Sequence, residues 1–114
     1  MHELSIAESL RSILEEEAKR QGFRRIVEVR LEVGKLSCVE PEALRFCFEE
    51  AMRGSVAEEA KLEIVEMPGK GWCKRCQKSF SLESFEPVCL ECGGMLEIVQ
   101  GQEVKVMEIL VSSC

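Results

Sequence analysis

The chain has 114 residues, of which 46% are hydrophobic and 32% are charged, so its length suits one small domain with an appendage. Its net charge of −6 argues against proteins that bind nucleic acid or anionic lipid surfaces, because both classes need a basic face. No apolar run approaches the roughly 20 residues of a membrane helix, and no signal peptide is visible, so we expect a cytoplasmic protein.

The first predicted helix begins near Ser5, whose spacing to Glu8 is that of a capping box, and it ends at Gly22. Apolar residues at helical period predict its buried stripe, which comprises Ile6, Leu10, Ile13, Leu14 and Ala18. The acidic run from Glu15 to Glu17 is predicted to be a solvated face of the same helix.

Residues 25–33 change to period two, which predicts a half-buried strand that ends at Gly34. Its predicted inward-facing residues are Val27, Val29, Leu31 and Val33. A second helix is predicted from Pro41, a favourable first helical residue, to Gly54. The buried stripe of this helix is predicted to comprise Leu44, Cys47, Phe48, Ala51 and Met52.

Two further strands are predicted at 61–67, stopped by Pro68-Gly69, and at 104–111. Between them, the stretch 71–98 holds four cysteines and few aliphatic residues, and so short a segment usually needs a metal or disulfides to fold. The sequence therefore predicts an α+β fold, in which two helices pack on a three-stranded sheet and a zinc-ribbon-like lobe is inserted. We expect one domain from residues 1–69 and 99–114, and a metal-binding domain from residues 70–98.

The inserted stretch contains two Cys-x-x-Cys pairs, Cys73 with Cys76 and Cys89 with Cys92. In a chain that is not exported, thiols are mostly reduced, so paired spacings indicate a metal before disulfides. Four thiolates suit a structural zinc, and they leave it no open position for water. The alternatives are an iron–thiolate electron carrier and a dithiol redox pair, although neither pair begins a helix within a strand–helix–strand unit.

The three remaining cysteines carry no metal-site pattern. Cys47 is predicted to be a core residue, Cys38 to lie in a loop, and Cys114 to face solvent. No Ser-His-Asp grouping or phosphate-binding loop is readable, and the chain has one histidine. We therefore do not expect an enzyme.

The chain begins Met1-His2-Glu3. In one interpretation, His2 is a solvated residue at a loose chain end. In the other, the amine of Met1, the backbone nitrogen of His2 and its imidazole form short chelate rings around a metal. Glu3 then adds a fourth donor, through either its backbone nitrogen or its carboxylate. Nitrogen donors in one plane favour Ni(II) or Cu(II) over zinc, so the geometry permits a nickel site without requiring one.

Four motifs follow one another in the chain: the opening MHELSIAESL, RLEVGKL at 30–36, PEAL at 41–44, and the two Cys-x-x-Cys pairs. Together they resemble the HypA/HybF family of hydrogenase maturation proteins over essentially the whole chain. The resemblance implies a nickel metallochaperone, with transported Ni(II) on Met1, His2 and Glu3. It also implies structural zinc on Cys73, Cys76, Cys89 and Cys92.

The resemblance further implies two partners, a HypB-type nucleotide-hydrolysing maturation protein and the large subunit of [NiFe]-hydrogenase, with urease maturation as a possible second branch. Some relatives supply another histidine to nickel or place one beside the zinc cysteines, but here His2 stands alone. Any additional nickel donor must then be Glu3, water or a partner's residue. We expect a monomer or weak homodimer that binds neither nucleic acid nor membrane. A zinc-ribbon nucleic-acid-binding module and an iron–thiolate electron carrier are the competing functions.

Overall fold

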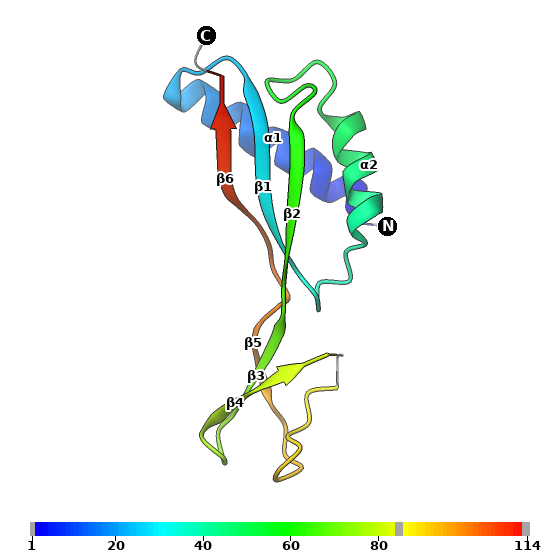
Figure 1. Ribbon diagram of the computed structural model, residues 1–114, viewed down its shortest axis with the longest axis vertical. Coiled ribbons are helices and arrows are strands. Elements are labelled where there is room, and N and C mark those ends of the chain that lie inside the picture. Colours follow the sequence, from blue (N-terminus) through cyan, green and yellow to red (C-terminus); the bar gives the residue numbers. More distant parts are fainter. Residues whose placement is uncertain (1, 84–85, 113–114) are drawn as a thin grey trace. The chain divides into compact units, whose positions relative to one another are not determined.

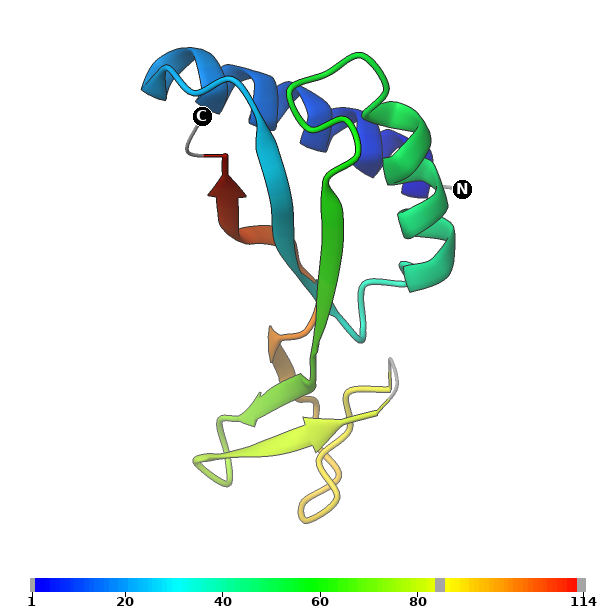
Figure 2. The same cartoon turned by 45° about the horizontal axis from the view of Figure 1, so that its top comes forward.

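The computed structural model describes residues 2–83 and 86–112. In this part of the chain the elements are, in order, α1 (Glu3–Gln21), β1 (Ile26–Gly34), α2 (Pro41–Ala51), β2 (Lys61–Met67), β3 (Gly69–Cys73), β4 (Lys78–Leu82), β5 (Glu97–Gln100) and β6 (Val104–Val111) (Figure 1). The strands form two three-stranded sheets, with the orders β2-β1-β6 and β4-β3-β5 (Figure 2). The predicted α+β class, with two helices and a cysteine-bearing lobe, is confirmed. Among these residues, none of the helices combines the length and apolar character needed to cross a membrane.

The chain divides into two compact units. Unit 1 comprises Met1–Leu31, Val39–Ile64 and Val106–Cys114, and unit 2 comprises Glu32–Cys38 and Val65–Lys105. The division falls within strands β1, β2 and β6, so each of these strands contributes residues to both units. Unit 2 is therefore larger than the stretch 70–98, and independent folding of that stretch stays a prediction.

Helix α1 begins earlier than its sequence pattern suggested. Its first residue is Glu3, so Ser5 lies inside the helix and the predicted capping box is wrong. His2 directly precedes the helix, and its carbonyl accepts a hydrogen bond from the Ile6 N–H at 2.9 Å. The predicted end is correct, because Gly22 adopts a φ of 78° and donates its N–H to the Ala18 carbonyl.

The buried face of α1 is rotated relative to the predicted stripe, and it comprises Glu3, Ala7, Leu10, Leu14 and Ala18. Ile6 is only half-buried and Ile13 is 52% exposed, so the prediction was wrong for both. Helix α1 packs against α2. A ranking by hydrophobicity favours isoleucine at buried positions. In α1, however, the small side chain of Ala7 and the carboxylate of Glu3 are buried instead.

Helix α2 has Pro41 in its first turn, as predicted, and the Glu40 side chain caps it by accepting hydrogen bonds from the N–H groups of Glu42 and Ala43. The helix ends at Ala51, with Met52 as its cap, and Gly54 lies in the turn that follows. Its core residues are Leu44 and Phe48, followed by the buried Met52. Cys47 and Ala51 are half-buried, so they flank the core instead of belonging to it.

Strand β1 lies at the centre of its sheet, and Val29, Leu31 and Val33 are buried as predicted. At its start Ile26 is buried and Val27 is exposed, which reverses the predicted orientation. Arg30 forms ion pairs with Glu63 of β2 and, at 2.7 Å, with Glu108 of β6, so these three side chains share one face of the sheet. The strands predicted at 61–67 and 104–111 are confirmed as β2 and β6.

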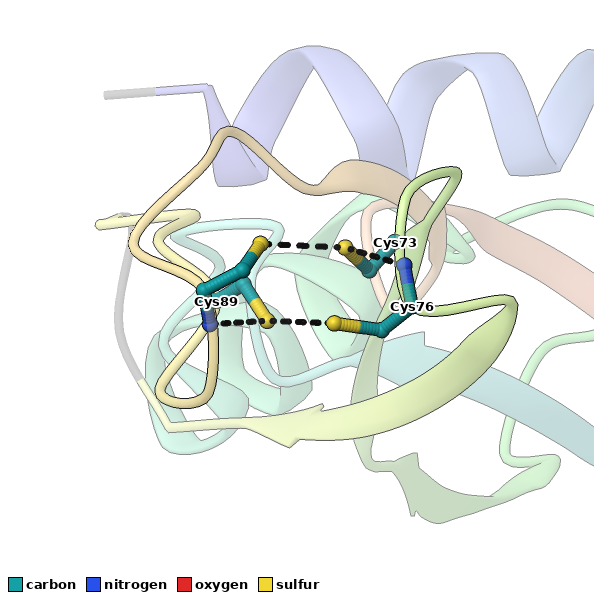
Figure 3. A group of neighbouring side chains, drawn as sticks. Cys73, Cys76 and Cys89 are labelled. Carbon is teal, nitrogen blue, oxygen red and sulfur yellow. Dashed lines mark hydrogen bonds between the residues drawn. The ribbon is translucent and has the colours of Figure 1, made fainter.

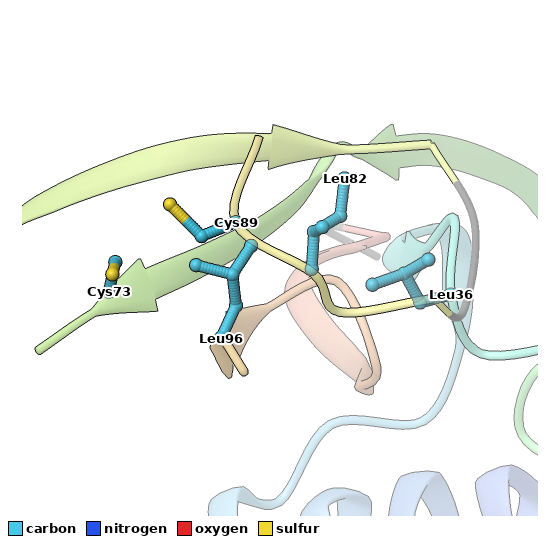
Figure 4. Packing of buried hydrophobic residues seen from close by; sticks show 5 residues of the cluster. All are labelled: Leu36, Cys73, Leu82, Cys89 and Leu96. Carbon is cyan, nitrogen blue, oxygen red and sulfur yellow. The ribbon is translucent and has the colours of Figure 1, made fainter. Parts of the chain in front are cut away.

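Unit 2 contains the second sheet and a small core of its own. Only Pro68 separates β2 from β3, so Pro68-Gly69 ends one strand but does not end the extended conformation. The core cluster comprises Leu36, Cys73, Leu82, Cys89 and Leu96 (Figure 4). Two of these five residues are cysteines, so apolar burial by itself gives unit 2 little stabilisation.

Candidate metal sites

Four cysteine sulfurs converge in unit 2. Cys73 is the last residue of β3, Cys76 lies in the turn to β4, and Cys89 and Cys92 lie between β4 and β5. Figure 3 shows Cys73, Cys76 and Cys89 facing one another across two separate loops. Each of the four sulfurs lies within 4.8 Å of the other three, and in the part of the chain that the structure describes this is the one such group.

The two Cys-x-x-Cys turns are built alike. In the first, the Cys76 N–H donates to the Cys73 sulfur at 3.3 Å, and in the second the Cys92 N–H donates to the Cys89 sulfur at 3.4 Å. The residue after each pair, Gln77 or Gly93, has a positive φ and donates its N–H to the carbonyl of the first cysteine at 2.8 Å. Each turn therefore aims two sulfurs at one point.

The sulfur positions fit a tetrahedral ion. The Cys73 and Cys92 sulfurs lie 3.7 Å apart, and the Cys76 and Cys89 sulfurs lie 3.8 Å apart. Zinc–sulfur bonds of about 2.3 Å in a regular tetrahedron place neighbouring sulfurs about 3.8 Å apart. All four donors are thiols, a set that zinc accepts in closed structural sites. The cluster thus suits zinc, and it leaves no position open for water.

The cysteines differ in how readily they lose a proton. Hydrogen bonds from the backbone, chiefly from the Cys92 N–H, lower the pKa of Cys89 to about 7. Burial, followed by hydrogen bonds with the other three thiols, raises the pKa of Cys76 to about 12. A divalent cation at the centre favours the thiolate form of all four, so metal binding must release protons.

A basic side chain lies beside the sulfurs. Lys78 pairs with Glu91 at 2.6 Å, and its pKa is raised first by this carboxylate and then by Cys76 and Cys89. Lys78 therefore has a favourable electrostatic interaction with two of the four sulfurs. Lys74 and Arg75 are exposed on the first turn.

At the other candidate site, the first predicted donor, Met1, lies outside the described residues. His2 is exposed, and its side chain does not cap α1. Glu3 is only 7% exposed, and its Oε2 accepts a hydrogen bond from the Glu40 N–H at 3.1 Å. This bond, followed by one from Glu3's own N–H, lowers the pKa of the Glu3 carboxyl, although burial opposes the shift. The carboxylate is therefore ionised and held against the residue that caps α2.

No pattern of residues indicates this anchoring role for Glu3. Its partner is a backbone N–H 37 residues further along the chain, and any residue except proline provides such a group. A similar interaction ties down part of the acidic run, because the Glu15 Oε2 accepts from the Val56 N–H at 3.1 Å. Glu15 and Glu17 are half-buried, so only Glu16 is the solvated side chain predicted for all three.

Among the other cysteines, Cys38 is exposed in a loop, as predicted, and has a positive φ. Cys47 is half-buried on α2. Cys114 lies outside the described residues.

Comparisons with known proteins agree over the length of the chain. A family model described as "Hydrogenase/urease nickel incorporation, metallochaperone, hypA" matches residues 1–111. The chain is 49% identical to "Hydrogenase maturation factor HypA" of Azotobacter chroococcum mcd 1 over 112 residues, which cover 97% of this chain and 99% of the relative. Identity to the protein with the same description from Azotobacter vinelandii is 47%, with the same coverage.

Two solved structures are also similar. One is described as "Solution structure of the Ni metallochaperone HypA from Helicobacter pylori", with a TM-score of 0.75, 29% identity and 97% of each chain covered. The other, "Solution structure of HypA protein", has a TM-score of 0.77 and 28% identity, and covers 99% of this chain and 98% of that chain.

Proposed function

This chain belongs to the HypA family of nickel-incorporation metallochaperones, and on that premise we propose that it binds Ni(II) at its N-terminus and delivers the ion for maturation of [NiFe]-hydrogenase. The proposed donors are the amine of Met1, the backbone nitrogen and imidazole of His2, and one donor from Glu3. In the same proposal, zinc on Cys73, Cys76, Cys89 and Cys92 has a structural role.

One observation carries the nickel assignment, namely the contrast between two adjacent residues. His2 is exposed and its imidazole makes no capping bond to α1, whereas Glu3 is buried and hydrogen-bonded to the backbone of Glu40. His2, which can chelate a metal, thus lies exposed next to Glu3, which a hydrogen bond holds in place. Nitrogen donors joined by short chelate rings favour a planar arrangement, which suits Ni(II).

The contacts of Glu3 favour its backbone nitrogen as the fourth donor. A metal bound through the carboxylate competes with the Glu40 N–H for the same side chain, which has little exposed surface. The backbone nitrogen of Glu3 belongs to the first residue of α1, so it has no helical partner four residues earlier and its N–H bonds locally to Glu3's own carboxylate. In this proposal the carboxylate positions the site, and a backbone nitrogen completes the plane.

A site with few donors at a chain end also suits the release of nickel. A partner's ligands can displace such donors one at a time, whereas a closed cage traps its ion. Protons compete with nickel for the amine, the imidazole and the backbone nitrogen, so we expect affinity to fall as the pH falls. The four-cysteine cluster is a closed set of donors that retains its ion, which supports a structural role for its metal.

The proposed partners are a HypB-type nucleotide-hydrolysing maturation protein and the nickel-free large subunit of the hydrogenase. Supply of nickel to urease is a second branch of the same proposal, supported by the wording of the family description. Four reduced thiols around a metal require a reducing compartment, so we place the protein in the cytoplasm.

Titration of untagged protein with Ni(II), read from the absorbance of the planar complex, tests the proposal. The His2→Ala variant, and a variant with one additional residue ahead of Met1, should both lose nickel binding while their zinc content is unchanged. Glu8→Gln, which removes an exposed carboxylate in the second turn of α1, is the matched control and should bind like the parent protein. Parental nickel stoichiometry in either of the first two variants overturns the proposal.

A further inference from the structure

The second Cys-x-x-Cys turn has an apolar outer face. Val88 and Met95 form an antiparallel bridge, flanked by hydrogen bonds from the Cys89 N–H to the Gly94 carbonyl at 2.8 Å and from the Leu96 N–H to the Pro87 carbonyl at 2.7 Å. In a pair flanked in this way the two side chains lie close together on one side. Side chains alternate along extended backbone, so Cys89 and Leu96 point to the opposite side, into the core. Val88 and Met95 therefore lie outside the core, and both are exposed.

Leu90 is a third exposed apolar residue of this turn. It lies between the two metal-ligand candidates Cys89 and Cys92 and is 91% exposed, while Met95 is 77% exposed. These are the two most exposed large hydrophobic side chains among the residues that the structure describes. Single exposed apolar residues are ordinary on protein surfaces, whereas three exposed apolar residues gather on and beside this one turn, and we call them the apolar patch. Covering them with a partner removes apolar area from water at a gain of about 25 cal/mol per Å².

A groove of about 380 Å³ lies beside this turn. Trp72 of β3 lines it and stands opposite Glu97 of β5 in the strand register, so these two side chains share one face of the second sheet. Met95 lines the same groove, which joins it to the apolar patch. The groove and the patch are thus one continuous surface of unit 2.

The rim of the groove is basic, although the chain as a whole carries a net charge of −6. Lys74 and Arg75 both line the groove, and within residues 2–83 and 86–112 neither forms an ion pair. Lys78 and Glu91 neutralise each other nearby, and Glu97 is the one acidic residue in the lining. The cysteine sulfurs lie further in, with Cys73 and Cys89 buried. An approaching molecule therefore meets two cations around an apolar centre.

We propose that this surface docks a segment of the nickel-receiving protein that carries carboxylates beside large apolar side chains. We call it the knuckle face, defined as Trp72, Lys74, Arg75, Val88, Leu90 and Met95. The partner's apolar side chains cover the patch, and its carboxylates pair with the two cations, which gives orientation and faster association. The proposal rests on the delivery function above, because it assumes a protein that accepts nickel.

The knuckle face contains none of the proposed nickel donors. The knuckle face belongs to unit 2 and the proposed nickel donors to unit 1, so a recipient that docks on the knuckle face occupies none of those donors. The four-cysteine metal then serves recognition, because it fixes the turn that keeps Leu90 and Met95 outside the core.

The test measures binding of the full chain, loaded with zinc, to immobilised nickel-free large-subunit precursor of the hydrogenase. Leu90→Ser/Met95→Ser and Lys74→Glu/Arg75→Glu should each weaken binding by roughly tenfold or more. Binding of the parent protein should also weaken as salt rises from about 0.05 M to about 0.5 M, because exposed charges are screened.

Two matched controls separate this surface from general effects. Phe46→Ser removes a 69% exposed apolar side chain from α2, and Lys19→Glu/Arg24→Glu reverses two exposed cations in unit 1. Both controls should bind the precursor like the parent protein. Zinc content and nickel stoichiometry, measured on every variant, should be unchanged. If Leu90→Ser/Met95→Ser loses zinc, Leu90→Gln/Met95→Gln takes its place, and it should weaken binding to the same extent.

Three outcomes overturn the docking proposal: parental affinity in either knuckle-face variant, equal weakening by a control, or loss of self-association in Leu90→Ser/Met95→Ser where the parent protein forms dimers through this face. Each of these leaves the nickel titration of the parent protein intact. Failure of that titration overturns the delivery function instead, so the two proposals fail in different experiments.

Discussion

The carboxylate of Glu3 accepts a hydrogen bond from the backbone N–H of Glu40 at 3.1 Å. The bond joins the first residue of α1 to the residue that caps α2, two positions 37 residues apart in the chain with the whole of β1 between them. It gives the proposed nickel-binding end a fixed support, even though His2 beside it is exposed.

Replacing Glu3 by glutamine should therefore make stability less dependent on pH. The folded-state pKa of Glu3 is lowered, so its charged form contributes stability above the ordinary carboxyl pKa of about 4, and this contribution is lost as the pH falls through the lowered value. We expect Glu3→Gln to be less stable than the parent protein near pH 7 and to lose less stability on acidification. Urea unfolding across this range measures both effects, with Glu8→Gln as the exposed control. Parallel pH profiles for Glu3→Gln and the parent protein would contradict the anchoring role.

The observed phase of α1 makes a second prediction, because Leu14 is buried and its neighbour Ile13 is 52% exposed. Leu14→Ala should lower the free energy of unfolding by about 2–5 kcal/mol, through lost burial and the cavity left behind. Ile13→Ala should change it by about 0.5 kcal/mol or less, as expected for an exposed site. Denaturant titration of the two variants distinguishes the observed helix orientation from the predicted one, in which both residues are buried.

The error at Ile13 shows what a single sequence reveals about α1. The period and the C-terminal end of the helix were readable, because Leu10, Leu14 and Ala18 recur at helical spacing and Gly22 provides a left-handed stop. Which face of α1 is buried could not be read from the sequence, because that face is set by packing on α2. Ala7 and Glu3 belong to the buried face. Similarly, β3 reads Gly-Lys-Gly-Trp-Cys, and two glycines in five residues conceal its strand pattern.

A third prediction concerns close backbone packing in unit 2. A Cβ atom added at Gly34 would lie 2.0 Å from the carbonyl oxygen of Gly101, and backbone atoms cannot move aside cheaply. Gly34→Ala should therefore destabilise the protein by about 3 kcal/mol. In the control Gly22→Ala, nothing lies within 4 Å of the new Cβ, and the positive φ should cost only about 1 kcal/mol. Equal destabilisation in the two variants would show that the clash is relieved.

A fourth prediction concerns the cysteine cluster. The purified protein should contain one zinc per chain and no iron, and Cys92→Ser should lose the zinc. With its metal removed by a chelator under reducing conditions, the stretch 70–98 should lose its dispersed backbone NMR signals, while the helical circular dichroism of α1 and α2 is retained. Cys47→Ser, which changes a half-buried cysteine of α2, should keep its zinc. Simultaneous loss of helix and lobe signals would contradict a separately folding insertion.

The two candidate sites differed in how far sequence reasoning could reach. The four-cysteine cluster was predictable, since Cys73 and Cys76, and likewise Cys89 and Cys92, approach one another through turns only four residues long. The support of the N-terminus was not, since Glu3 meets a backbone group contributed by a distant loop. Local chemistry is visible in a pattern of residues, whereas a side chain's long-range backbone partner is not.

The cysteine-bearing segment has two tethers, because it leaves the β2-β1-β6 sheet through β2 and returns to the same sheet through β6. If residues 68–103 unfold when the metal is removed, as we expect, the sheet must close them as a disordered loop, at an entropic cost of about 3 kcal/mol for a loop of this length. A folded lobe holds the two tethers together in advance and removes most of that cost. Zinc bound to the four cysteines would therefore stabilise the sheet that its segment leaves and rejoins, and a shortage of zinc would weaken the proposed nickel carrier.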